Sequence, residues 1–304
     1  MPSNDINRKR KESTMGKKDI TEKKLEDYPD VFADIVNTLL FNGETIIKES
    51  NITAGPTASI YKAETGDSKE QFRDTLKYIR GADILISSIG IENQSDVISH
   101  MPIRVMGYDY SSYRQQLIEK NPVRPVITMV LNFSEGKWNK AKSLYDMFGE
   151  VAEEIKPYLQ DYKLNIFDIR FIDDETIKKF KSDFKEVVCV FKYGQSYAQH
   201  FKTEETEMSH SDEVIELMSF LNKKSSFDLA GFKTLKNQKG GRVVMSDVIN
   251  EIMDRGREEG REEGKIAGKI ETIYMLIDSG EITLERGAQI LGISVEQLKK
   301  DRGL

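Results

Sequence analysis

Asp74, Glu92 and Gln94 are the residues of this 304-residue chain whose types and spacing best suit metal chemistry. Asp74 opens one strand-like run, 72–79, while Glu92 and Gln94 close the next, 83–93. Strand side chains alternate, so Glu92 and Gln94 share a face, and side-by-side pairing of the runs would bring Asp74 close to Glu92. Two carboxylates there would form a hard-oxygen site for Mg²⁺ or Mn²⁺. Such an ion polarises a phosphoryl oxygen and lowers the pKa of bound water, which Gln94 would orient.

Three further side chains could complete this site, and each has a structural alternative. Arg104 and Tyr108 are four residues apart on an expected helix and so lie on one face. This arrangement predicts that Arg104 clamps a phosphate while Tyr108 positions it. The structural alternative is that Arg104 forms a salt bridge and Tyr108 packs at the edge of the core. Lys77 could add positive charge, although a regular strand turns it away from Asp74 and a bulge would be needed. By spacing alone, the acids also fit exposed carboxylates at sheet ends.

Composition limits the chemistry and the partners. A single cysteine, Cys189, excludes an intramolecular disulfide and zinc sites built on several thiolates. Three scattered histidines leave carboxylates and carbonyls as the main metal ligands. The net charge of −6 gives no overall support to DNA binding, although a local basic groove is compatible with it. No apolar run approaches the ~18–20 residues of a membrane span. We therefore expect a cytoplasmic protein without membrane contact.

Hydrophobic patterning predicts an α/β domain, with a mixed sheet flanked by helices. The expected order through the acid-bearing runs is a helix at 29–41, a short strand at 44–49, a loop at 51–58, strands at 72–79 and 83–93, a helix at 101–118 and a strand at 126–133. Later segments predict a helix at 139–160, a strand at 164–172 and helices at 174–193 and 211–223.

The two ends of the chain differ from this domain. Residues 1–24 are rich in Lys and Arg and lack apolar periodicity, which predicts a disordered basic tail, either solvated or touching DNA. A polar, Gly-containing hinge at 236–242 separates the expected domain, 25–235, from a helical C-terminal extension, 236–304.

Within the extension, glycines recur every four residues at Gly256, Gly260, Gly264 and Gly268. On a helix they form one stripe, which is typical of a homo-oligomer seam or of a solvated connector helix. The final segment, LERGAQILGISVEQLKK, has helix-turn-helix texture, with Ser294 and Gln297 spaced as a capping box. That pattern fits a DNA-binding element or a small helical bundle of another kind.

Several stretches together resemble a known family. They are DVFADIVNTLLF (30–41), RDTLK (73–77), GIENQ (90–94), MPIRVMGYDYSSYRQQL (101–117) and PVITMVLNF (125–133). In this order they resemble the recombination-promoting nuclease and putative transposase family of the PD-(D/E)XK superfamily. The resemblance implies a restriction-endonuclease-like core in which Asp74 and Glu92 bind a divalent metal. Gln94 stands where the superfamily's name has Lys, and Asp34 lies on the first helix, where an accessory acid is expected.

The resemblance implies a Mg²⁺-dependent DNA endonuclease associated with recombination or mobile elements. Asp74 and Glu92 would hold the metal, Gln94 would orient water and Arg104 would contact phosphate. The alternative is an inactive nuclease fold that acts as a DNA-binding or protein-interaction module, which the acidic pI and the neutral Gln94 favour. A third reading is a structural oligomer organised by the Gly-striped helix.

Overall fold

The computed structural model describes residues 21–56, 58–62, 68–72, 74–81, 86–196, 207–221 and 229–301. The chain divides into two compact units, 1–223 with 228–246, and 224–227 with 247–304. None of the helices in these described ranges combines the length and apolar character that crossing a lipid bilayer requires. Residues 1–20, most of the expected basic tail, lie outside the described ranges.

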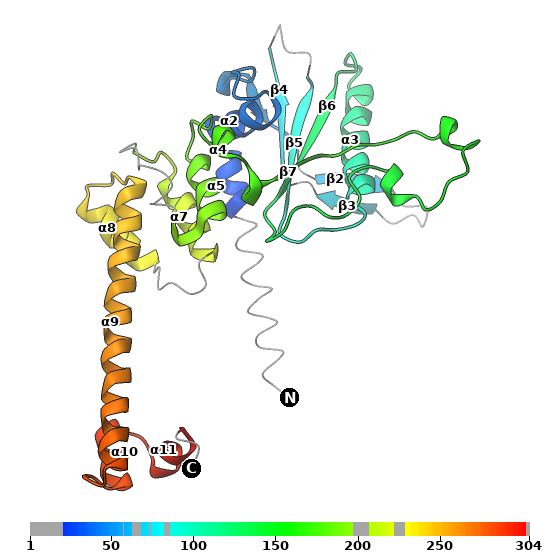
Figure 1. Ribbon diagram of the computed structural model, residues 1–304. Helices are drawn as coiled ribbons and strands as arrows, with labels where there is room; N and C mark the ends of the chain where they lie inside the picture. The colour runs from blue at the N-terminus through cyan, green and yellow to red at the C-terminus, as the bar shows by residue number, and fades with distance from the viewer. Residues whose placement is uncertain are drawn as a thin grey trace. The chain divides into compact units, whose positions relative to one another are not determined.

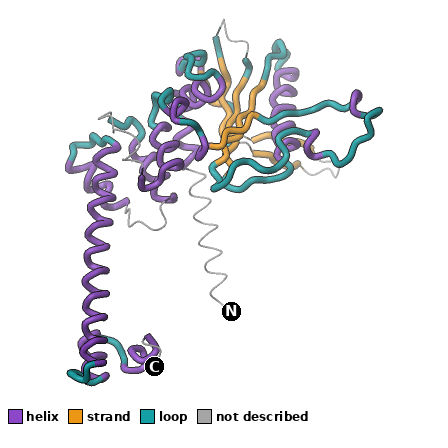
Figure 2. The backbone as a smooth tube through the Cα atoms, viewed as in Figure 1, coloured by secondary structure: helices purple, strands orange, loops and turns teal. Residues whose placement is uncertain are grey.

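A five-stranded mixed sheet forms the centre of the first unit (Figure 1; orange in Figure 2). Its spatial order is β1 (Ile52–Ala54), β4 (Thr75–Ile79), β5 (Ser88–Gln94), β6 (Val126–Asn132) and β7 (Asn165–Asp168). The first three strands are antiparallel, while β5, β6 and β7 run parallel. The parallel step from β5 to β6 requires a crossover, which α3 (Met101–Ile118) supplies.

Helices cover both faces of this sheet, with α3 on one face and α2 (Pro29–Leu40) and α5 (Phe184–Tyr193) on the other (Figure 1). Burial on both faces explains why β5 and β6 read as nearly continuous apolar runs. Ile89, Ile91, Met129 and Leu131 are fully buried. Cys189 of α5 belongs to the same apolar interior.

The predicted helix at 101–118 and strand at 126–133 are confirmed by α3 and β6. Pro102 in the first turn suits the start of α3, because the first amides of a helix need no partner within it. Asp109 accepts a 2.5 Å hydrogen bond from the Thr128 hydroxyl, which ties α3 to β6. A core of Met101, Val105, Val130 and Trp138 fills the space between them.

Several predicted elements ahead of the acid-bearing strands were wrong. Residues 44–48 form no strand, and η1, a 3₁₀ turn, follows at Glu49–Asn51. The expected loop at 51–58 contains β1, which pairs with β4. A separate antiparallel hairpin, β2 (Ala58–Lys62) with β3 (Ser68–Phe72), stands between β1 and β4 in sequence. Strands of only five residues carry too little apolar alternation to be read from sequence.

The helix expected at 139–160 was also wrong. This stretch contains only two 3₁₀ turns, η2 (Tyr145–Met147) and η3 (Lys156–Tyr158). Residues 144–162 form a projecting arm, closed at its base by an antiparallel bridge between Ser143 and Lys163. Gly149 and Pro157 interrupt a segment that otherwise has helical composition.

Helices after β7 are shorter than expected. The predicted strand at 164–172 ends at Asp168, and η4 (Ile169–Phe171) follows. The predicted helix at 174–193 is broken into α4 (Asp174–Ile177) and α5 (Phe184–Tyr193), after which come η5 (Gly194–Ser196), α7 (Ser211–Leu221) and α8 (Leu229–Gln238). The sequence also placed residues 21–24 in the polar tail, whereas they belong to a helical segment, 21–27, with Leu25 buried.

The second unit is built from α9 (Met245–Asp278), most of which it contains, α10 (Leu284–Leu291) and α11 (Val295–Asp301). Gly292 ends α10 in the left-handed conformation, with φ of 70°. The Ser294 hydroxyl accepts a 3.1 Å hydrogen bond from the amide of Gln297, which confirms the Ser294 half of the predicted capping box. The Gln297 side chain instead donates a 2.6 Å hydrogen bond to Asp301. The four striped glycines have open space where a Cβ would lie, so no close helix contact covers them within the described chain.

Candidate active site

The register of β4 and β5 places Asp74 directly across from Glu92. Thr75 pairs with Ile91 and Leu76 with Gly90, so the pair one step beyond Thr75 and Ile91 is Asp74 and Glu92. Residues opposite each other on antiparallel strands point to the same face, with Cβ atoms ~4.5–5.5 Å apart. Asp74 sits in the bend just before β4, and its Oδ2 accepts a 2.7 Å hydrogen bond from the amide of Asn93. The strand pairing that the sequence analysis required is therefore present.

Glu92 is completely buried and is held by two side chains. The Nη2 of Arg104 lies 2.7 Å from its Oε1, and the Nε2 of Gln94 lies 3.1 Å from the same oxygen. Gln94 also donates a 2.8 Å hydrogen bond to the carbonyl of Asn93. A buried carboxylate is tolerable because its charge is matched by the guanidinium. Gln94 therefore orients Glu92 in this structure.

Arg104 and Tyr108 share one face of α3, as their spacing predicts, and they contact each other. The Nε of Arg104 donates a 2.8 Å hydrogen bond to the Tyr108 hydroxyl. Burial and the neighbouring Glu92 carboxylate raise the pKa of Tyr108 to about 12. Burial acts most strongly on Arg104 and lowers its pKa, but Glu92, Tyr108 and Asp74 together outweigh burial, so the pKa is raised. Both groups thus keep their protons at neutral pH, and the site holds one fixed positive charge against Glu92.

Lys23 is a member of the site that sequence reasoning missed. Its Nζ lies 2.8 Å from Oδ1 of Asp74, with the lysine side chain 41% exposed and the aspartate side chain 16% exposed. Lys23 falls within a stretch read as a solvated tail, because Leu25 and Tyr28 alone give too little periodicity to predict a helix. Glu22 and Glu26 are four residues apart, so on a helix both side chains lie on one face. This spacing is the one sequence signal for the helical segment that carries Lys23.

A second acidic group, Glu26, lies on the opposite face of the same strands. Thr75 donates a 3.3 Å hydrogen bond to its Oε2. Burial, followed by the charge of Glu22, raises the pKa of Glu26 well above its ordinary value. Lys77 is on this face too, where it is buried and contacts the Asp27 carboxylate and backbone carbonyl. The structure therefore does not bring Lys77 to the acid pair.

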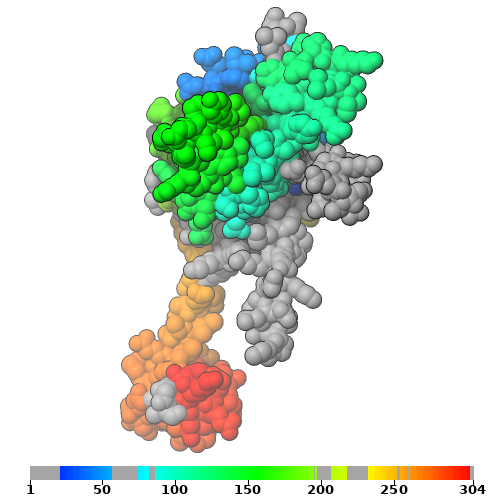
Figure 3. All heavy atoms as spheres, turned by 90° about the vertical axis from the view of Figure 1, so that its right-hand side faces the viewer, coloured from blue at the N-terminus to red at the C-terminus, as the bar shows by residue number. Residues whose placement is uncertain are grey.

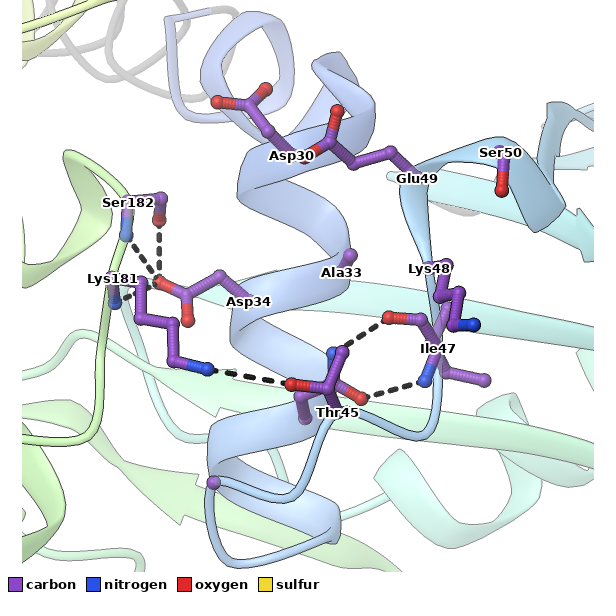
Figure 4. A pocket seen from close by; sticks show the side chains of 12 residues that line it. Asp30, Ala33, Asp34, Thr45, Ile47, Lys48, Glu49, Ser50, Lys181 and Ser182 are labelled. Atoms are coloured by element: carbon purple, nitrogen blue, oxygen red, sulfur yellow. Dashed lines mark hydrogen bonds between the residues drawn. The ribbon is translucent and has the colours of Figure 1, made fainter.

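Asp34 lies at a different place, in an open pocket of about 610 Å³ beside α2 (Figure 4). Its Oδ2 accepts hydrogen bonds from the Lys181 amide at 2.9 Å, the Ser182 amide at 2.7 Å and the Ser182 hydroxyl at 2.7 Å. These bonds fix the turn between α4 and α5. The pocket is not lined by Asp74 or Glu92. The Asp34 carboxylate is thus engaged in holding the backbone.

The donor set at the acid pair fits a hard divalent cation. No group of three or more His, Cys, Asp or Glu residues in the described part of the chain is arranged to hold a metal ion. Mg²⁺, however, typically takes one or two carboxylates and fills its other positions with waters and substrate phosphate. Asp74 and Glu92 supply those two carboxylates. Their present partners, Lys23 and Arg104, have long side chains with exposed portions.

Comparison with known proteins gives one match. No curated protein and no solved structure matches the chain. Residues 85–217 match the family described as "Putative transposase, YhgA-like". The matched segment contains Glu92, Gln94, Arg104 and Tyr108 and begins after Asp74. From the approach to β5 through most of α7, the chain is thus similar to a transposase-like family.

Proposed function

We propose that this protein is a metal-dependent endonuclease that hydrolyses phosphodiester bonds in DNA and serves a mobile element or recombination. The observation that carries the proposal is the register of β4 and β5, which, continued one residue past Thr75 and Ile91, sets Asp74 opposite Glu92. Similarity to a transposase-like family supports an association with mobile DNA. The mixed five-stranded sheet with flanking helices also supports it, because the core that the resemblance implies is of this α/β class.

Each residue of the site has a distinct role in this proposal. Asp74 and Glu92 hold Mg²⁺ or Mn²⁺, which when bound supplies Lewis acidity toward a phosphate oxygen and a more acidic water. Gln94 fixes the Glu92 carboxylate with its amide. Arg104 exchanges part of its contact with Glu92 for a phosphate oxygen, since a guanidinium binds both kinds of oxyanion. Tyr108 holds the guanidinium in place through its hydroxyl.

Plasmid cleavage in Mg²⁺ tests the proposal. Asp74→Asn should reduce cleavage at least about 100-fold, because a catalytic metal ligand is worth several kcal/mol of transition-state stabilisation. Asp96→Asn, a matched change at an exposed acid just past β5, should cleave like the wild type. Equal activity in wild type and Asp74→Asn would disprove the site.

A second candidate function is a non-catalytic DNA-binding or protein-interaction module. The observation that favours it is that both carboxylates already contact cations of the chain, Glu92 with Arg104 and Asp74 with Lys23. Calorimetric titration with Mn²⁺ separates the two functions. Binding that is lost in Asp74→Asn supports the nuclease, whereas absence of binding at millimolar Mn²⁺ supports the module.

A further inference from the structure

Helix α3 has an apolar face that points away from the sheet. Ile103, Met106, Tyr110, Leu117 and Ile118 are all exposed, Leu117 by 63%. Their spacing of three, four, seven and eight residues puts them on one side of the helix, opposite buried Val105 and Tyr108. We call this set the outer α3 face. A helix that is apolar on both sides normally has a partner on both sides.

The arm, 144–162, is a second apolar surface in the same unit. Tyr158 is 83% exposed, and Phe148 and Ile155 are exposed as well. The arm is nevertheless well fixed. The Leu144 amide bonds to the Tyr162 carbonyl at 3.0 Å, and the Tyr145 hydroxyl bonds to the Lys156 carbonyl at 3.0 Å. Figure 3 shows the arm (green) standing out toward the viewer. A rigid projection with apolar side chains at its tip is suited to docking.

The two surfaces carry opposite charge. The arm contains five acidic residues, Asp146, Glu150, Glu153, Glu154 and Asp161, and a single basic one, Lys156. The outer α3 face and the turn that follows it carry exposed Arg114, Lys120 and Arg124, with Glu119 as the acid among them. Opposite potentials steer association and set its register. The acidic arm also disfavours a nucleic-acid partner at that surface.

We infer that the occupant of the outer α3 face is the arm of a second copy of this chain. One chain carries both an apolar acidic projection and an apolar basic helix face, so two copies can exchange arms reciprocally. Each exchange covers Ile155 and Tyr158 of one copy and Tyr110 and Leu117 of the other. Exchange in both directions closes the assembly at two copies. The inference is independent of the proposed nuclease activity and uses a different surface from the glycine stripe of α9.

Sedimentation velocity of the full chain tests the contact. The wild type should sediment as a species with twice the 34.8 kDa mass of one chain. Tyr158→Glu in the arm and Leu117→Glu on α3 should each weaken dimerisation at least tenfold. Both side chains are exposed in the single chain, so the far-UV circular dichroism spectrum should be unchanged, whereas the melting temperature should fall with the loss of the dimer. Ile266→Glu, at an exposed apolar position of α9, is the matched control and should remain dimeric.

Mixing the two variants decides the geometry. A Tyr158→Glu chain keeps its α3 face and a Leu117→Glu chain keeps its arm, so the mixture should recover a mixed dimer with one intact contact. The inference would be overturned by a monomeric wild type, by a dimer insensitive to both variants, or by two variants that do not complement each other. If Leu117→Glu lowers DNA affinity with no change in mass, the face belongs to nucleic acid and the inference fails.

Discussion

Two carboxylate sites in the first unit are built in opposite ways. Asp34 is held by two backbone amides and a neighbouring hydroxyl from the turn at Lys181 and Ser182. The pair Asp74 and Glu92 is held largely by the side chains of Lys23, Arg104 and Gln94. Backbone donors cannot leave a carboxylate without unfolding the turn, whereas long side chains can rotate away. The pocket beside α2 therefore surrounds an acid that holds the backbone, and the acid pair with exchangeable partners is the better candidate for chemistry.

The strongest test of this contrast is Arg104→Ala. The change leaves the Glu92 carboxylate buried without its cation, which should lower the free energy of unfolding by about 3–4 kcal/mol. Urea denaturation measures the loss. Adding Glu92→Gln should recover much of it, because no buried charge remains. Full stability of the single variant would show that water reaches Glu92 more freely than its burial indicates.

Asp34→Ala should have the next largest effect. It removes four hydrogen bonds to a charged acceptor, three from the turn at Lys181 and Ser182 and one from Thr38, and should destabilise the protein by about 2–3 kcal/mol in the same measurement. Mn²⁺ affinity of the folded fraction should stay at the wild-type value. A loss of metal binding at a temperature where the variant is fully folded would place Asp34 in the metal site. Asp34 and the acid pair would then no longer differ in role.

Glu26→Gln extends the comparison to the far face of the strands. Because the pKa of Glu26 is raised by folding, its contribution is most favourable below the ordinary pKa and is lost as pH rises toward the folded-state value. At pH 8 the variant should therefore be more stable than wild type by at least about 1 kcal/mol. At pH 4 the two should be alike. Thermal unfolding from pH 4 to 8 follows the difference, and parallel curves would refute it.

Lys23→Met should change stability least. An ion pair with a side chain that is 41% exposed contributes at most about 1 kcal/mol. Mn²⁺ should bind several-fold more tightly, because the competing ammonium is gone and Asp74 keeps its charge. Lys24→Met serves as the neighbouring control. Weaker Mn²⁺ binding in Lys23→Met would mean that Lys23 supports the site and does not compete with the cation.

Much of the fold around the acid pair could be predicted from sequence. Dense apolar runs with clear ends identified α2, α3, β5 and β6, and the alternation rule put Glu92 and Gln94 on one face. Elements of low apolar content could not be predicted. The strands β2 and β3 are short, and residues 139–160 have helical composition yet contribute most of the arm.

The candidate site was predicted in part. The pairing of Arg104 with Tyr108 followed from their spacing, but the pairing of Arg104 with Glu92 depends on how α3 lies on the sheet, which spacing does not encode. Lys23 could not be found, because its contact with Asp74 spans about fifty residues of chain and depends on a short docked helix. Asp34 was expected near the metal, and only tertiary structure reveals that it holds the turn at Ser182.

The buried Cys189 gives the chain a natural reporter. Burial raises the pKa of this thiol to about 12. Alkylating reagents react with the thiolate, so the native thiol should be almost inert at pH 8. The chain has no other cysteine. The rate at which iodoacetamide modifies the protein therefore measures how often the interior around α5 opens, and it can rank variants without denaturant or an introduced label.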